Sequence, residues 1–127
     1  MLVDNKYPVF VLYKHLYSPR FKIGFKYFRG LTFYPFIFIS PEYKSDVSLL
    51  EHEKQHVRQF FKYPFIFPFM YAFSKTYRQK FEVEAYRKQL EFIEGKYKKI
   101  YTENFASCLC KYYGLDITKE QAMKELS

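Results

Sequence analysis

The chain contains little cysteine and no apolar run long enough to cross a bilayer. Its two cysteines, Cys108 and Cys110, would point about 200° apart on a helix, so they are poorly placed to bond each other. We expect two reduced thiols, as in a cytosolic protein. The most apolar stretch, residues 63–73, carries two prolines and is shorter than the roughly twenty residues of a spanning helix. The first residues also lack the basic start and apolar run of a signal peptide, and we therefore expect a cytoplasmic protein.

Tryptophan, internal repeats and low-complexity segments are also absent from the sequence. The 127 residues suit one domain over residues 1–127, and an apolar content of 49% excludes a disordered protein. The net charge of +8 would favour anionic partners, but the basic residues are scattered, and the densest cluster, residues 96–99, is typical of a solvated helix face. Because the chain carries no nucleic-acid-binding signature, we expect no nucleic acid partner.

What the sequence does contain is an H-E-x-x-H motif. His52 and His56 would lie one turn apart on a helix, so both imidazoles can reach one metal ion. Glu53 would lie about 100° around the helix from His52, close enough to take a proton from a metal-bound water without being a ligand. Neutral imidazole suits zinc, and a catalytic zinc usually has three protein ligands and one open position. The motif thus supplies two ligands and a general base, and a third ligand must come from elsewhere.

The residues around the motif favour a half-buried helix. On a helical wheel Leu49, Gln59 and Phe60 fall near the histidines, a second apolar strip runs beside them, and charged residues take most of the remainder. A solvated helix would not surround its two histidines with apolar neighbours. The pattern therefore predicts that the motif lies at the edge of the core.

Residues 7–40 are predicted to form the β part. Residues 8–13 and 21–28 are rich in β-branched and aromatic residues, and a turn is expected at residues 29–30. The next run, residues 31–40, resembles a strand, but Pro35 confines it to an edge or a bulge. An edge strand before the motif helix would offer unpaired backbone groups to an extended peptide. The alternative is an irregular loop packed on that helix.

The rest of the chain is predicted to be helical. Ser45 or Asp46 can cap the motif helix, which should end near Phe61. Residues 63–73 are expected to form a buried connecting segment; attachment to a membrane surface is the alternative, favoured by a lysine on either side. The helices expected beyond this segment are residues 77–96 after a Ser74 or Thr76 cap, residues 104–113 before Gly114, and a last helix to Leu126 after a Thr118 and Gln121 capping box. The predicted fold is therefore α+β, with a small N-terminal antiparallel sheet that has an edge strand, followed by four or five helices.

A carboxylate on a second helix could complete a zinc site of two histidines and one glutamate. Residues 82–85, Glu-Val-Glu-Ala, offer Glu82 and Glu84. Helix positions only two apart face different directions, so we do not expect both carboxylates to bind the same metal ion. Helix geometry alone leaves open which of the two is the ligand.

With this later glutamate, the sequence resembles the gluzincin metallopeptidases, especially their minimal single-domain members, over residues 31–90. In that family an edge strand precedes an H-E-x-x-H helix of a zincin-like fold, and a glutamate in a Glu-x-x-Ala pattern is the third zinc ligand. The resemblance implies Glu82 as that ligand. Many relatives carry an acid one turn further on, which orients a ligating imidazole, whereas this chain has Tyr86. Glu84, Tyr86 or a backbone carbonyl is then expected to orient the histidine.

The resemblance implies a zinc metallopeptidase with one Zn²⁺ ion, held by His52, His56 and Glu82. Glu53 would act as general base, and the substrate would be an extended peptide or protein chain. A further donor should stabilise the oxyanion; one of the fourteen tyrosines or His15 is a candidate.

Two other functions are compatible with the sequence. The first is a non-catalytic, zinc-stabilised interaction protein that binds a protein partner or a membrane surface. The second is a basic aromatic module that binds nucleic acid or anionic membrane without metal. Peripheral membrane contact is therefore an expected possibility under several of these functions.

Overall fold

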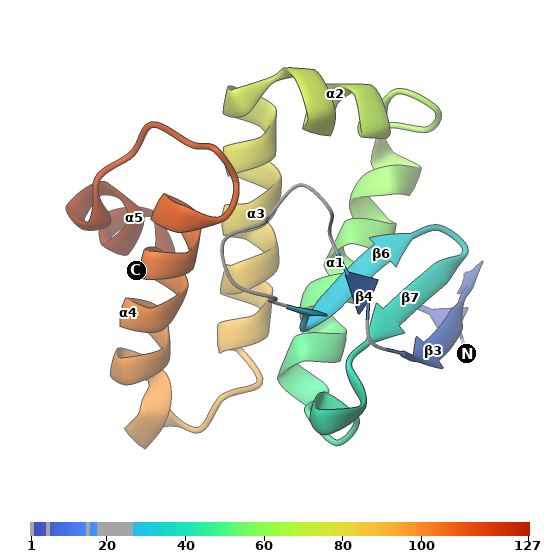
Figure 1. Ribbon diagram of the computed structural model, residues 1–127, viewed down its shortest axis with the longest axis horizontal. Helices are drawn as coiled ribbons and strands as arrows, with labels where there is room; N and C mark the ends of the chain where they lie inside the picture. Colours follow the sequence, from blue (N-terminus) through green and yellow to red (C-terminus); the bar gives the residue numbers. More distant parts are fainter. Residues whose placement is uncertain (1, 5, 15, 18–26) are drawn as a thin grey trace.

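The computed structural model describes residues 2–4, 6–14, 16–17 and 27–127 of the chain. In this part, a small three-stranded mixed sheet near the N-terminus is followed by five α-helices (Figure 1). The expected α+β fold is thus confirmed.

The central sheet consists of β3 (Phe10–Tyr13), β6 (Gly30–Phe33) and β7 (Phe36–Ile39), in the order β3-β7-β6. β7 pairs antiparallel with β6 but parallel with β3, so the sheet is mixed rather than wholly antiparallel. The prediction of one continuous strand over residues 31–40 is wrong. Residues 34–35 turn the chain into a hairpin, because Pro35 has no N–H to donate to a ladder and lies outside the paired residues. β3 and β6 are the edges of this sheet, and β6, called the edge strand below, lies beside the motif helix.

Two short pairs complete the strands of the described residues. β1 (Leu2–Val3) pairs with β2 (Tyr7–Pro8), and β4 (Leu16–Tyr17) pairs with β5 (Tyr27–Phe28). Only Tyr27 and Phe28 of the predicted strand 21–28 belong to the described part, and residues 21–26 lie outside it, as does the candidate His15. A 3₁₀ turn, η1 (Pro41–Tyr43), then leads to the first helix.

Helix α1 (Val47–Lys62) carries the motif. Asp46, rather than Ser45, is its N-cap, and the Asp46 carboxylate accepts a hydrogen bond from the backbone N–H of Leu49 at 3.1 Å. Both histidines lie on the buried side of the helix, together with Leu49 and Val57. The amphipathic pattern of the sequence therefore predicts the buried face correctly.

Helix α2 (Phe67–Phe73) lies across the ends of α1 and α3 (Lys75–Leu90), as Figure 1 shows at the top. The prediction that residues 63–73 are a buried connecting segment is wrong. The inward side chains of α2 contact α3, with the rings of Phe67 and Phe81 4.8 Å apart, but its outer side is covered by nothing in the described part of the chain. Ser74, one of the two expected caps, begins α3 by accepting from the N–H of Tyr77.

The predicted helix 77–96 is too long, because the chain reverses after Leu90 and α4 (Gly95–Lys111) begins. The reversal lets Phe105 and Leu109 of α4 pack against Leu90 in one apolar cluster, whereas a straight extension of α3 would leave these side chains in water. α4 therefore begins earlier than the expected residue 104. Its cysteines, Cys108 and Cys110, are not joined by a disulfide in the described part of the chain.

Helix α5 (Lys119–Leu126) has the predicted capping box. The Thr118 hydroxyl accepts from the backbone N–H of Gln121, and the Gln121 side chain accepts from the backbone N–H of Thr118. Gly114, in the connection from α4, has a φ of 65°, a conformation that suits glycine. The predicted stop at Gly114 comes three residues after the last residue of α4.

The described residues form two apolar cores. One lies between the N-terminal strands and α1, and the other is formed by α3, α4 and α5. The contact between α1 and α3 separates them, and there the buried side chains are mostly polar. Those polar side chains are Ser48, His52, His56, Gln59, Glu82 and Gln89. Burying so many polar groups is unfavourable unless each has a partner, and this layer is therefore where a functional site is expected.

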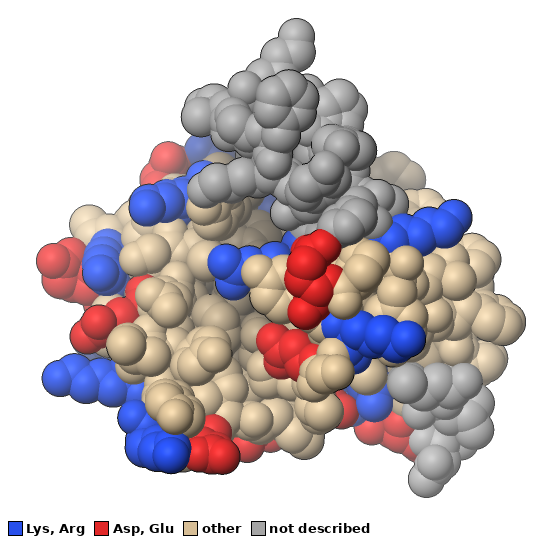
Figure 2. Space-filling view, turned by 60° about the horizontal axis from the view of Figure 1, so that its bottom comes forward, with Lys and Arg blue, Asp and Glu red and all other residues tan. Residues whose placement is uncertain are grey.

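The surface carries charges of both signs side by side. On the face shown in Figure 2, Lys and Arg side chains are interspersed with Asp and Glu. Among the described helices, none has both the length and the apolar composition required to cross a bilayer.

Candidate metal centre

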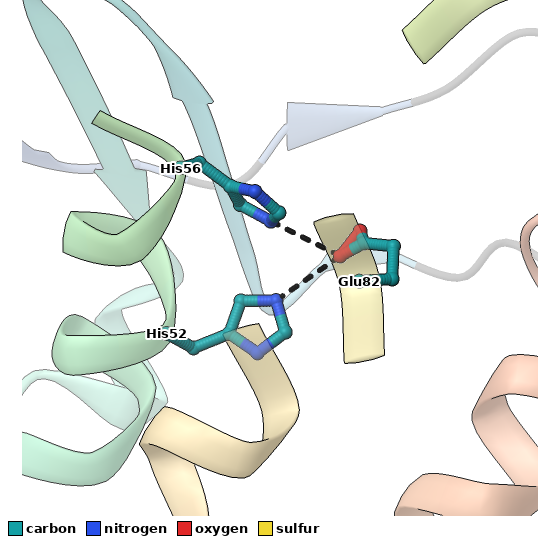
Figure 3. Close-up of side chains that lie close together, drawn as sticks. All are labelled: His52, His56 and Glu82. Carbon is teal, nitrogen blue, oxygen red and sulfur yellow. Dashed lines mark ion pairs between the residues drawn. The ribbon is translucent and has the colours of Figure 1, made fainter. Parts of the chain in front are cut away.

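Three of the predicted ligands meet in the layer between α1 and α3. His52 and His56 point from successive turns of α1 toward Glu82 of α3 (Figure 3). Glu82 Oε1 lies 3.3 Å from Nε2 of His52 and 3.0 Å from Nε2 of His56. The ligand atoms of all three residues lie within 4.8 Å of one another, and this buried group could hold a metal ion. Glu84 is not part of the group.

A glutamine fixes the tautomer of His56. The amide Nε2 of Gln59 donates to the backbone carbonyl of Phe81 at 2.9 Å, and a carbonyl can only accept. The amide oxygen of Gln59 must then face Nδ1 of His56, 2.8 Å away, so that Nδ1 carries the hydrogen and donates it. In the neutral imidazole the lone pair is consequently on Nε2, the atom that faces Glu82.

A second glutamine, Gln89, fixes the tautomer of His52 through a series of hydrogen bonds that ends at Asp46, the N-cap of α1. The Ser48 hydroxyl donates to the Asp46 carboxylate at 2.6 Å, so its oxygen is left to accept from Nε2 of Gln89 at 3.5 Å. The oxygen of Gln89 then accepts from Nδ1 of His52 at 3.0 Å. Both Nε2 lone pairs are thereby directed at Glu82.

The expectation that Glu84, Tyr86 or a backbone carbonyl orients a histidine is therefore wrong. The ring of Tyr86 packs edge-on against the ring of His52, with centroids 4.5 Å apart, and its hydroxyl is bonded to that of Tyr113. The orienting glutamines were not identified from the sequence. The feature of the sequence that could have identified Gln59 is its position beside the histidines on the helical wheel, where an uncharged polar side chain must face the interior.

The two oxygens of Glu82 have different surroundings. Oε2 accepts a hydrogen bond from the hydroxyl of Tyr71 on α2 at 3.0 Å. Oε1 is buried and, in the described part of the chain, has no hydrogen-bond partner, because the Nε2 atoms that lie close to it carry a lone pair and no hydrogen in the neutral imidazoles. Two lone pairs and a carboxylate oxygen that converge without a donor repel one another, and a bound cation relieves that repulsion. The residues thus fit a metal ion.

The charges around the site alter its acid–base behaviour. Burial lowers the pKa of His56, but the negative charge and hydrogen-bonding capacity of Glu82 outweigh it and raise the pKa to about 9. Burial likewise raises the pKa of Glu82, yet the two imidazoles bring it well below its usual range. Burial and the charge of Glu82 both raise the pKa of Tyr71, which therefore keeps its proton and acts as a donor. Without metal, a proton on His56 takes the place of the cation.

Glu53, the predicted base, is buried on the side of α1 that faces the edge strand. The hydroxyl of Thr32 on β6 donates to Oε2 of Glu53 at 2.7 Å. A Cβ atom added to Gly30 on the same strand would lie only 2.8 Å from Oε1 of Glu53. β6 therefore holds the carboxylate by a hydrogen bond from Thr32 and by close packing against Gly30, where a larger residue would require the Glu53 side chain to shift.

No family model, curated protein or solved structure matches the chain, so the function has to be inferred from the geometry of the site.

Proposed function

We propose that the chain is a zinc-dependent metallopeptidase in which His52, His56 and Glu82 bind the metal and Glu53 is the general base. The observation that carries this proposal is the buried Oε1 of Glu82, which has no hydrogen-bond partner among the described residues and is faced by the oriented Nε2 lone pairs of two imidazoles. Two neutral imidazoles and one carboxylate form a ligand set that zinc favours. Three protein ligands also leave one tetrahedral position for chemistry.

The residues around the triad have chemical roles in this proposal. A bound zinc ion would supply Lewis-acid activation of a water molecule and of the peptide carbonyl. Glu53 would accept a proton from the attacking water and pass it to the leaving amine as the C–N bond breaks, so that water is added across the bond. Thr32 holds the Glu53 carboxylate in place, which keeps the acceptor oriented between the two proton transfers.

The edge strand and Tyr71 have the two remaining roles in the proposed reaction, which are binding the substrate and stabilising the developing oxyanion. β6 has a sheet partner on one side among the described residues, and an extended substrate could pair with its other side close to Glu53. Tyr71 keeps its hydroxyl proton and lies against Glu82, so it is a candidate donor for the negative charge that develops on the substrate oxygen.

The Glu53→Gln variant tests this proposal. We expect it to keep one equivalent of zinc and to lose at least about a hundredfold in hydrolysis of a mixed peptide library followed by mass spectrometry, because an amide cannot accept the proton. Glu84→Gln, the same change at a glutamate outside the triad, is the matched control and should retain both zinc and activity. Equal turnover by Glu53→Gln and the wild type would refute the assignment of the base.

A second function, a non-catalytic zinc-stabilised interaction protein, is favoured by one observation. All three ligands are buried, and they join the two apolar cores across the contact between α1 and α3. A metal in that position stabilises the folded state by binding it and not the unfolded chain. This function predicts a large loss of thermal stability on chelation and no cleavage by the zinc-loaded wild type of any library peptide, whereas the peptidase predicts cleavage.

A further inference from the structure

We infer that the outer side of α2 docks on a membrane surface that carries anionic lipid. This surface, called the α2 face below, consists of Phe69 and Phe73 of the helix together with Phe65 and Ile66, which directly precede it. The inference is independent of the proposed hydrolysis, since it rests on residues that do not touch the metal centre.

The α2 face is apolar and exposed. The exposed fractions are 84% for Phe65, 53% for Ile66, 64% for Phe69 and 83% for Phe73. Phe69 and Phe73 are one turn apart and their rings are nearly parallel, with centroids 6.5 Å apart, so they form a continuous surface. The inward side of the same helix contributes Phe67 and Tyr71 to contacts with α3. A helix that is apolar on both sides is unusual at a protein–water boundary, and an exposed patch of this kind marks an interaction site.

The backbone at Phe65 supports a specific role for this presentation. Phe65 has a φ of 67°, in the left-handed region that bulky aromatic residues rarely adopt. This conformation accompanies the most exposed of the four side chains. A strained backbone that presents an aromatic ring to solvent is expected where the ring has a binding function.

The charge around α2 identifies the kind of partner. From residue 54 to residue 81 the sequence contains no Asp or Glu, but it contains six basic residues. They are Lys54, Arg58, Lys62, Lys75, Arg78 and Lys80, of which Lys54 pairs with Glu51 and Arg58 with Asp4, both away from α2. Lys62 and Lys75 flank α2 directly; Lys62 is exposed, and Lys75 is exposed although its ammonium group pairs with Asp116 at 2.8 Å.

Aromatic side chains between basic residues fit the boundary between acyl chains and anionic headgroups. The phenyl rings would enter the apolar boundary, and the lysines would remain at the level of the phosphates. α2 has seven residues, far fewer than a spanning helix, so it would lie in the plane of the surface. The Tyr71 hydroxyl, on the opposite side of α2, would then hold Glu82 about one helix diameter, ~10 Å, below the lipid.

The test is binding of the zinc-loaded full chain to sedimented phosphatidylcholine vesicles prepared with and without phosphatidylglycerol. We expect binding that requires phosphatidylglycerol and weakens as salt is raised. Partial burial of one phenylalanine changes binding about tenfold, so Phe69→Ser with Phe73→Ser should weaken it about a hundredfold. The matched control carries Phe92→Ser and Ile100→Ser, two exposed apolar residues away from α2, and should bind like the wild type.

Zinc content and the thermal unfolding midpoint of each variant show whether the chain is folded. Equal vesicle binding by the α2 variant and the control variant would overturn the inference. The inference would also be overturned if the wild-type chain did not bind anionic vesicles but formed a dimer, and if Phe69→Ser with Phe73→Ser dissociated that dimer. The α2 face would then bind a second copy of the chain. Salt-insensitive binding to vesicles of phosphatidylcholine alone would overturn the requirement for anionic lipid.

Discussion

Replacing Gln59 with methionine should weaken both the fold and the metal centre. Gln59 is buried in α1, where its oxygen accepts from Nδ1 of His56 and its amide group donates to the carbonyl of Phe81 on α3. Methionine has a similar length and fills the same space, but it offers neither a strong acceptor nor a donor. The substitution thus removes two hydrogen bonds between groups that remain buried.

The two losses differ in size. Nδ1 of His56 carries its hydrogen whether the ring is neutral or charged, so it becomes a buried donor without a partner, which costs about 1–3 kcal/mol. The Phe81 carbonyl lies within α3 and keeps its helical bond, so its loss is about 0.5–1.5 kcal/mol. Together they should lower the free energy of unfolding of the chelated protein by about 2–4 kcal/mol, which a domain of ordinary stability survives. Because His56 is then free to change tautomer, zinc affinity should fall about 10–100-fold.

Urea unfolding in the presence of a chelator measures the first effect, and competition with a chromophoric chelator measures the second. Gln79→Met is the matched control, because the Gln79 amide bonds Glu125 at the surface, and it should change stability by no more than about 0.5 kcal/mol. If Gln59→Met unfolds at the same urea concentration as the wild type and binds zinc equally well, the tautomer argument is refuted.

The remaining predictions concern protonation and packing at the same site. In chelated protein the pKa of His56 is raised from 6.5 to about 9, so its stabilising effect is complete below about pH 6.5 and is lost as the pH rises through about 9. Thermal unfolding with chelator should therefore show a falling midpoint over that range, and His56→Gln should lack the fall; a flat profile for the wild type would contradict the ion pair. The pH dependence of zinc affinity should run in the opposite direction. The affinity should rise up to about pH 9, because the metal displaces the proton of His56. Gly30→Ala would put a methyl group 2.8 Å from Oε1 of Glu53, so peptide hydrolysis should fall about a hundredfold with zinc content unchanged. Gly95→Ala, whose Cβ would meet nothing within 4 Å, should match the wild type in both assays, and an active Gly30→Ala variant would show that Glu53 need not be held there.

Local patterns in the sequence predict much of the fold. The helical wheel of the motif gives the buried face of α1, and the Thr118 and Gln121 spacing gives the start of α5, because amphipathicity and capping depend on neighbours within one turn. Glu82 required more than local patterns. Helix geometry leaves Glu82 and Glu84 open, and only the packing of α3 on α1 brings Glu82 to the histidines.

The features that sequence patterns do not give depend on which surfaces meet. Pro35 is compatible with an edge strand or with a turn. It lies in a turn here because β6 pairs with β7 on either side of it. Leu90 ends α3 because α4 folds back on it, although nothing in the helical pattern requires a stop there. Tyr71 is one of fourteen tyrosines, and its bond to Glu82 arises from the way α2 crosses the ends of α1 and α3.

The polar layer between the two apolar cores has a consequence for the protein in a cell. A chain made when metal is scarce has Glu82 and a protonated His56 in the contact between α1 and α3, where a metal ion would otherwise bind both. Local opening along that contact is then easier, and proteases act on the opened form in proportion to its population. The lifetime of the protein, and with it the amount present, would then rise and fall with metal supply.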